Sequence, residues 1–177
     1  MKLLSTHHIY AIGLGSNRRH GRYGTPRRVL EGAFDALEGA GIHPLLLSPI
    51  IHTVPLGPGG RGFANAAALV ATTFDPTDLL TALKAIEHAF GRRRGRRWGA
   101  RVLDLDILLW SGGAWTSGGD RPLRIPHRHV ASRRFVLDPL VAIAPAWRLP
   151  GGHSIRQHHA RLTRAKPTHR THNRSGP

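Results

Sequence analysis

The order of strand-like and helix-like segments constrains the fold of this chain most. Short apolar runs bounded by turn residues predict strands, and apolar residues spaced three and four apart predict amphipathic helices. The predicted elements are, in chain order, a strand at 9–14, a helix at 26–37, strands at 45–52 and 63–73, a helix at 76–90, a strand at 102–110, a glycine-rich turn region at 111–120, a short strand at 123–125 and a helix at 131–142 that is interrupted or restarted at Pro139. The first six form the order of a split βαβ unit, so we expect an α+β fold with helices packed on an antiparallel sheet.

The composition changes near residue 150. From Gly151 onward the chain is rich in His and Arg, contains no acidic residue and has few large apolar residues. Such a segment buries too little apolar surface to order itself. Since 177 residues suit a single domain, we expect one folded domain at 1–150 and a mobile basic tail at 151–177, with at most a short helix near 158–162.

The chain is strongly basic, with 26 Lys and Arg against 10 Asp and Glu and a formal net charge of +16. We interpret the tail as a solvated extension. The alternative is an electrostatic tether for nucleic acid, which would bind only nonspecifically because aromatic residues are not interleaved with the basic ones. A module that binds RNA or DNA is therefore a second hypothesis for the chain as a whole.

Two absences narrow the class of protein. No apolar run approaches the roughly 18 residues of a membrane span, and the absence of cysteine excludes disulfides and thiolate metal sites. Polar residues at 5–8 interrupt the apolar start at 1–4, so we do not expect a signal peptide there. We expect a cytoplasmic protein without membrane association. We also expect a monomer, because no long apolar surface stripe is left unexplained.

Two carboxylates share one face of the predicted strand at 102–110. Side chains alternate along a strand, so Asp104 and Asp106 project to one side while Leu103, Leu105 and Ile107 project into the core. Neighbouring carboxylates repel each other, so a positive group is expected between them. Arginine or a hard divalent cation would serve, and the spacing alone admits either.

An arginine-rich segment at 92–101 precedes this strand and contains six arginines. Six cations are more than two aspartates neutralise, so the surplus indicates an anionic ligand. Guanidinium groups match phosphate oxygens, and a triphosphate with Mg²⁺ would satisfy both the arginines and the aspartates. A solvated basic loop and a nucleic-acid patch are the alternatives for this segment, and a metal-dependent phosphoesterase is a third hypothesis for the protein.

These residues resemble the 6-hydroxymethyl-7,8-dihydropterin pyrophosphokinase family. Its hallmark is a basic residue, Trp-Gly-Pro-Arg, two residues and Asp-apolar-Asp, and Arg97 to Asp106 follow this pattern with Ala100 in place of the proline. Other motifs occur in the family's order at 13–17 (Gly-Leu-Gly-Ser-Asn), 53–57 (Thr-Val-Pro-Leu-Gly), 63–65 (Phe-Ala-Asn), 86–87 (Ile-Glu), 125–127 (Ile-Pro-His) and 133–135 (Arg-Arg-Phe). The resemblance covers roughly residues 9–150.

The resemblance implies a ferredoxin-like fold and transfer of pyrophosphate from ATP to the pterin hydroxymethyl oxygen, with release of AMP. It implies that Asp104 and Asp106 hold two Mg²⁺ ions. The residues that would contact the ATP phosphates, or order the loops that do, are Arg92, Arg94, Arg97, Arg101, His127 and Arg133. The residues that would bind the pterin are Thr53, Leu56 and Asn65 at its edge, Phe63 and Phe135 on its faces, and Trp98 closing over it.

Each carried-over role has a plainer alternative in the residues themselves. Phe63 or Phe135 alone is explained by core packing, and His127 by a surface turn after a proline. Glu87 is interpreted as an ion-pair partner that holds the arginine-rich loop. The basic residues after Asn17 depart from the family pattern, so we assign no site residue there.

Overall fold

The computed structural model describes residues 7–53, 62–91, 101–119 and 122–164. Its elements are β1 (His8–Ser16), α1 (Pro26–Gly39), β2 (His43–Leu47), β3 (Ile51–Thr53), β4 (Phe63–Thr72), α2 (Pro76–Ala89), β5 (Asp104–Trp110), β6 (Trp115–Thr116), β7 (Arg124–Ile125), α3 (Arg134–Ile143) and α4 (Ile155–Thr163).

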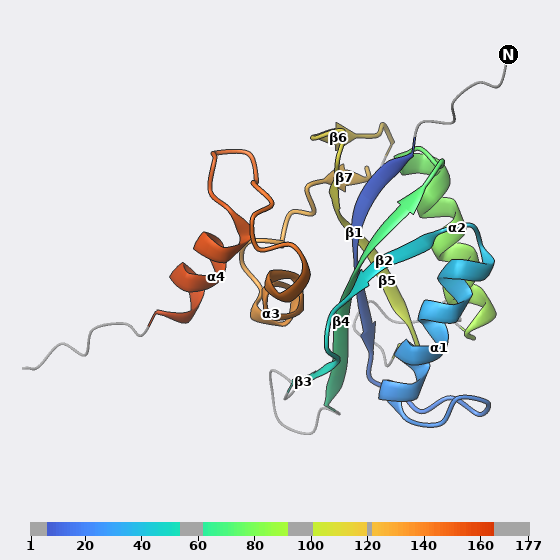
Figure 1. Cartoon of the computed structure of the whole chain (residues 1–177). Coiled ribbons are helices and arrows are strands. Elements are labelled where there is room, and N and C mark those ends of the chain that lie inside the picture. The colour runs from blue at the N-terminus through green and yellow to red at the C-terminus, as the bar shows by residue number, and fades with distance from the viewer. Residues whose placement is uncertain (1–6, 54–61, 92–100, 120–121, 165–177) are drawn as a thin grey trace, which may run out of the picture.

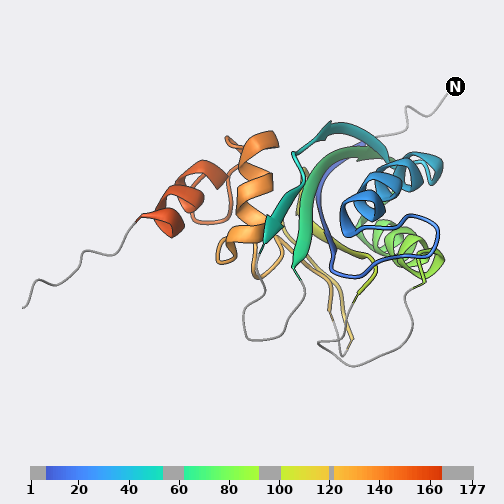
Figure 2. The same cartoon turned by 90° about the horizontal axis from the view of Figure 1, so that it is seen from below.

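The main sheet has the strand order β2-β4-β1-β5, with β3 also paired to β4, and all of these pairs are antiparallel. Helices α1 and α2 cover one face of the sheet, and α3 lies on the other face with α4 beyond it (Figures 1 and 2). β6 and β7 form a separate two-stranded sheet. The topology confirms the predicted α+β, ferredoxin-like fold.

Local sequence signals fix the start of the two long helices. Thr25 caps α1, and its hydroxyl accepts a hydrogen bond from the amide of Arg28 at 3.4 Å. Asp75 caps α2 and accepts from the amides of Thr77 and Asp78, both at 2.8 Å. Proline follows each cap, where its missing N–H costs no helical bond.

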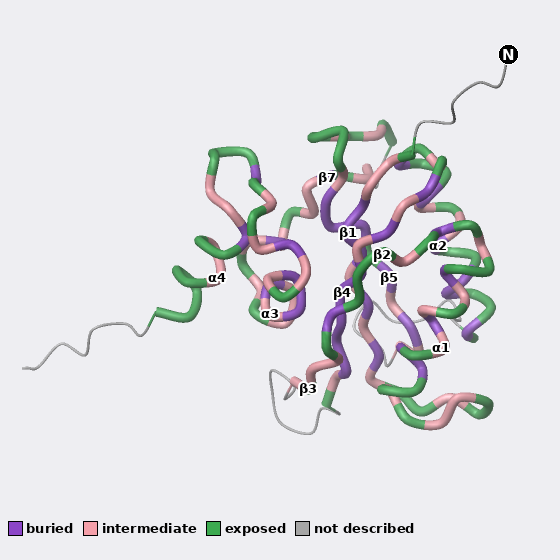
Figure 3. The backbone as a smooth tube through the Cα atoms, viewed as in Figure 1, coloured by how far each residue is buried: buried purple, intermediate pink, exposed green. Residues whose placement is uncertain are grey.

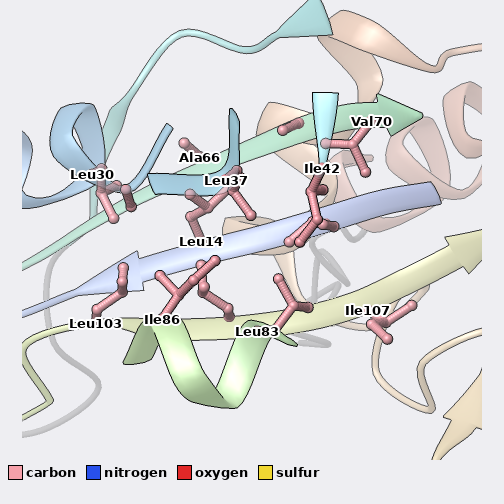
Figure 4. Packing of buried hydrophobic residues seen from close by; sticks show 14 of the residues in the cluster. Leu14, Leu30, Leu37, Ile42, Ala66, Val70, Leu83, Ile86, Leu103 and Ile107 are labelled. Carbon is pink, nitrogen blue, oxygen red and sulfur yellow. The ribbon is translucent and has the colours of Figure 1, made fainter. Parts of the chain in front are cut away.

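The main core lies between the sheet and the helices α1 and α2. Alternate residues of the strands meet apolar stripes of both helices, as Figure 4 shows for Leu14 of β1, Leu37 of α1 and Leu83 of α2. From β5, Leu105 and Ile107 enter the same cluster. Burial of these side chains removes apolar surface of β1, β4 and β5 from water, which is the main source of stability.

A second cluster lies on the opposite face, under α3. It joins Ala11 of β1, Ala67 of β4 and Leu108 of β5 to Leu137 and Leu140 of α3. α3 packs on only part of this face of the sheet. The predicted site residues lie on the rest of it, near the end of β1 and the start of β5.

Residues 151–164, which the sequence analysis assigned to the tail, include the packed helix α4. The buried side chain of Ile155 joins the second cluster, and His159 Nε2 lies 2.9 Å from Asp138 Oδ1 of α3. Figure 3 shows α4 next to α3. The helix begins earlier than the expected 158–162 because Ser154 and Gln157 form a capping box. The described fold therefore extends beyond residue 150.

Two predicted elements differ in detail. The single strand expected at 45–52 is divided into β2 and β3, because Pro49 has no amide to donate and the hydroxyl of Ser48 accepts from Ala67 N of β4 instead. The helix expected to break at Pro139 runs through it as α3. One missing intrahelical bond is offset there by the burial of Leu137 and Leu140.

Candidate active site

Asp104 and Asp106 lie on the sheet face opposite to α1 and α2. In β5, Leu105 is fully buried, whereas Asp104 is half-buried and Asp106 is exposed, so the predicted alternation is confirmed. In the register with β1, Gly15 is opposite Asp104 and Gly13 is opposite Asp106. Gly15 carries no side chain beside Asp104, whereas the Leu108 side chain of β5 covers Gly13, where an added Cβ would lie 3.2 Å from it.

Asn65 and Thr53 lie on the other side of the same glycines. Asn65 of β4 is opposite Gly15, and a side chain placed on Gly15 would lie 3.5 Å from Asn65 Oδ1. The Asn65 amide is 6% exposed and donates from Nδ2 to Thr53 Oγ1 at 2.9 Å. Asn65 and Asp104 therefore occupy one row across the sheet, with Gly15 between them, and Thr53 contacts this row through the Asn65 amide. Phe63 is opposite Thr53 at the start of β4.

Arg101 connects the aspartates to the end of β1. Its guanidinium Nη1 lies 2.7 Å from Asp104 Oδ2. The Asn17 side chain accepts from the Arg101 amide at 2.8 Å, and the Asn17 amide donates to the Arg101 carbonyl at 3.2 Å. Asn17 thus binds both backbone groups of Arg101. Sequence reasoning quoted Asn17 within a motif but gave it no role.

His127 and Arg133 come from the segment between β7 and α3. The His127 amide donates to the Leu108 carbonyl of β5 at 2.9 Å, which holds this segment against the aspartate-bearing strand. The pKa of His127 is lowered chiefly by burial, and the nearby Asp106 carboxylate opposes this shift. Arg133 adds to the lowering and places its guanidinium 5.6 Å from the ring centroid of Phe135.

A cavity of about 380 Å³ lies beside the Asn17–Arg101 contact. It is lined by Asn17, Arg18, Arg19, Pro26 and Gly62. Gly62 directly precedes Phe63, so the cavity adjoins the predicted pterin-binding residues. Arg18 and Arg19 were left without a role in the sequence analysis, and both are exposed at the edge of this cavity.

The predicted residues Leu56, Arg92, Arg94, Arg97 and Trp98 lie outside the described residues. The remaining predicted site residues form two groups on either side of Gly15, which is opposite Asn65 of one group and Asp104 of the other. One group contains Thr53, Phe63 and Asn65 from β3 and β4, and the other contains Arg101, Asp104, Asp106, His127, Arg133 and Phe135.

The aspartate pair fits Mg²⁺ bound jointly with a phosphate ligand. Within the described part of the chain, no group of three or more His, Cys, Asp and Glu side chains could hold a metal ion. Mg²⁺ commonly binds through one or two carboxylates and completes its shell with substrate phosphates and water. Asp104 and Asp106 on one open strand face match that requirement, while Arg101 neutralises part of their charge.

Comparisons with known proteins agree with the sequence and the site. Residues 11–145 match the family 7,8-dihydro-6-hydroxymethylpterin-pyrophosphokinase (HPPK). A 2-amino-4-hydroxy-6-hydroxymethyldihydropteridine pyrophosphokinase of Pseudomonas aeruginosa is 42% identical over 147 residues, covering 81% of this chain and 85% of the relative. The Methylorubrum extorquens enzyme of the same name is 39% identical over 153 residues, covering 85% and 91%.

Solved structures agree on the fold. A Plasmodium falciparum HPPK-DHPS with pteroate has a TM-score of 0.72 at 15% identity and covers 90% of this chain. This chain spans 41% of that longer one. The family match and the relatives together support one conclusion: the chain belongs to the 7,8-dihydro-6-hydroxymethylpterin-pyrophosphokinase family, and it is a pyrophosphokinase of folate biosynthesis with ATP as co-substrate.

Proposed function

We propose that this enzyme transfers pyrophosphate from ATP to 6-hydroxymethyl-7,8-dihydropterin by direct in-line attack, with two Mg²⁺ ions held by Asp104 and Asp106. The observation that carries the proposal is the row formed by Asn65, Gly15 and Asp104 across the open sheet face. It sets a group suited to a pterin edge beside a group suited to magnesium and phosphate, with only a glycine between them.

The pterin would bind at the Asn65 end of this row. A pterin is flat and carries both donors and acceptors on its edge, which suits an amide with one group of each kind. The Thr53 hydroxyl fixes the orientation of the Asn65 amide by accepting from Nδ2 at 2.9 Å. Phe63 and Phe135 would bind the ring faces, with Leu56 at the edge and Trp98 covering the ring.

The triphosphate would bind at the aspartate end. Bound Mg²⁺ would orient the phosphate oxygens, neutralise charge on the departing AMP and acidify the hydroxymethyl group. Arg101 already lies against Asp104, and Arg92, Arg94, Arg97 and Arg133 would add guanidinium donors to the phosphates. Phosphoryl transfer of this kind depends on positioning and charge neutralisation rather than on a covalent enzyme intermediate.

His127 would contact phosphate as a neutral hydrogen-bond donor. Burial lowers its pKa below the ordinary histidine value of 6.5, so the ring is uncharged near pH 7. A neutral imidazole carries a proton on one ring nitrogen, which can donate to a phosphate oxygen. In this role His127 orients the triphosphate, while the arginines supply the positive charge.

The direct test is AMP formation from ATP and Mg²⁺, measured with and without 6-hydroxymethyl-7,8-dihydropterin. We expect AMP only when the pterin is present, in equal amount to the pterin diphosphate. Release of inorganic phosphate without pterin would indicate a phosphoesterase instead. Tight retention of a random oligonucleotide at physiological salt, without ATP turnover, would indicate a nucleic-acid-binding module.

The proposal also covers the state of the enzyme: a cytoplasmic monomer whose basic C-terminal segment binds nucleic acid at most nonspecifically. No described helix has the length and apolarity to cross a bilayer. The consecutive residues Leu45, Leu46 and Leu47 of β2 are about half exposed, so light scattering at several concentrations tests the monomer directly. A concentration-dependent mass that returns to the monomer value in Leu46→Lys would contradict it.

A further inference from the structure

Glu87 of α2 is a buried carboxylate within the main apolar core. Its side chain is 0% exposed, and among the described residues it is the single acidic side chain that is fully buried. It lies one helical turn beyond Leu83, on the face that packs against the sheet. A buried carboxylate is unfavourable unless charged and polar partners compensate for the lost water. Its partners therefore indicate what it does.

The Glu87 carboxylate and Lys84 together bind the backbone of Leu105. Glu87 Oε1 accepts from Leu105 N at 2.7 Å and from Lys84 Nζ at 2.8 Å. Lys84 Nζ also donates to Leu105 O at 3.3 Å. Two side chains from successive turns of α2 thus take both the donor and the acceptor of one residue in β5.

Leu105 is the residue between Asp104 and Asp106. Among the described residues, β5 is an edge strand of the main sheet and pairs there with β1 alone. The hydrogen bonds from Glu87 and Lys84 therefore satisfy the backbone N–H and C=O of Leu105, which a neighbouring strand would bind if β5 were not at the edge. An apolar side chain at position 87 would fill the core without binding this backbone. The buried Glu87 carboxylate and its ion pair with the part-exposed Lys84 therefore indicate a requirement for position rather than for packing.

We propose that Glu87 and Lys84 are positioning residues that fix the height and tilt of β5 at Leu105, and so aim Asp104 and Asp106 at a shared magnesium–triphosphate ligand. This inference rests on the proposed metal role of the two aspartates. It extends the role given to Glu87 from the sequence alone, which was to hold the arginine-rich loop. Groups that orient metal ligands typically change metal affinity about 10- to 100-fold when they are removed.

The test compares three variants of the full chain. Glu87→Leu removes the acceptor for Leu105 N and the partner of Lys84. Glu87→Gln keeps an oxygen acceptor and is the conservative rescue. Leu79→Ala lies on the same buried face of α2, two turns earlier, and is the control for a loss of core stability without a change at Leu105.

Two readouts avoid turnover altogether. The first is Mn²⁺ binding in the presence of a non-hydrolysable ATP analogue, by calorimetry or by the loss of the free-ion magnetic resonance signal. The second is hydrogen exchange of the Leu105 amide. We expect Glu87→Leu to weaken Mn²⁺ binding about tenfold or more and to accelerate Leu105 exchange, with Glu87→Gln within about threefold of the parent. Leu79→Ala should lower the melting temperature and leave Mn²⁺ affinity unchanged.

The proposal is overturned if Glu87→Leu lowers the melting temperature as Leu79→Ala does but leaves Mn²⁺ affinity unchanged. If Glu87→Leu fails to fold, Lys84→Met replaces it, with Mn²⁺ affinity at the parent value as the contradicting result. Asp106→Asn tests the metal role of the aspartates separately from the positioning role of Glu87. Unchanged Mn²⁺ binding in Asp106→Asn removes the metal role itself, whereas lost binding there with intact binding in the Glu87 variants removes only the positioning role.

Discussion

The two faces of the main sheet use the same strands for different purposes. The face under α1 and α2 is closed by large apolar side chains such as Ile12 and Leu14 of β1. On the other face the residues alternating with them are Ala11, Gly13 and Gly15, which are small or lack a side chain. α3 covers the first of these and leaves the glycines beside the aspartates. One face therefore carries the main core, and the open end of the other carries the proposed site.

The largest expected effect comes from the open face. Asp104→Asn and Asp106→Asn should each lower kcat/KM on the order of 1,000-fold or more, because the proposed metal ligands are lost. The melting temperature without Mg²⁺ should stay near the parent value, since both side chains contact solvent and their mutual repulsion is relieved. Steady-state AMP formation and thermal denaturation measure the two quantities. A large fall in melting temperature with activity retained would assign these residues to structure.

The closed face predicts the opposite pattern. Leu83→Ala should lower the free energy of unfolding by about 2–5 kcal/mol, because a fully buried side chain is replaced by a cavity. At a temperature well below the new melting point, kcat/KM should remain within a few-fold of the parent. Denaturant unfolding and the same activity assay test this pair of results. If Leu83→Ala lowered kcat/KM as much as the aspartate variants do, the separation of stability and activity between the two faces would be contradicted.

A smaller effect on stability and on KM is expected from Asn17, which directly follows β1 and holds Arg101. Asn17→Ala removes the side-chain acceptor of the Arg101 amide and should cost about 0.5–1.5 kcal/mol of stability. It should also raise KM for ATP several-fold, since Arg101 no longer holds its place against Asp104. Asn17→Asp retains an acceptor oxygen and is the matched control. Unchanged KM in Asn17→Ala would show that Arg101 is positioned by other contacts.

The smallest effect concerns pH. Burial lowers the pKa of His127 in the folded state, so between that value and the unfolded value the unfolded chain binds more protons. The stability linked to His127 is therefore complete above the ordinary histidine range and is lost as the pH falls toward the lowered pKa. Melting temperatures of the parent and His127→Gln from pH 7.5 down to 5 should show a shallower acid decline in the variant. A steeper decline in the variant would contradict the sign.

The sequence predicts the fold because periodicity is local. The spacing of Val29, Leu30, Ala33 and Leu37 is sufficient to define α1 and its buried face. Alternation likewise places Asp104 and Asp106 on one face of a strand without knowledge of any neighbour. The break between β2 and β3 has one local signal, because Pro49 has no amide to donate, whereas the bond from the Ala67 amide to the Ser48 hydroxyl joins two strands and is not a local property.

The contacts that organise the site are the part that local patterns could not supply. Asn17 and Arg101 are 84 positions apart, and Glu87 and Leu105 are 18 apart. A signal for Glu87 was nevertheless present, since a lone acid occurs four residues after Leu83 on an otherwise apolar helix face. The capping pair Ser154 and Gln157 similarly marked the start of α4, although its packing partner on α3 could not be read from the sequence.

The most direct measurement is a crystal structure of the enzyme with Mg²⁺, a non-hydrolysable ATP analogue and the pterin. We predict that both β5 carboxylates contact metal ions bridging to phosphate oxygens, with the pterin against Asn65. The contrary result is a bound nucleotide and pterin with Asp106 directed away from any ion and Asp104 paired with Arg101 but bound to no ion.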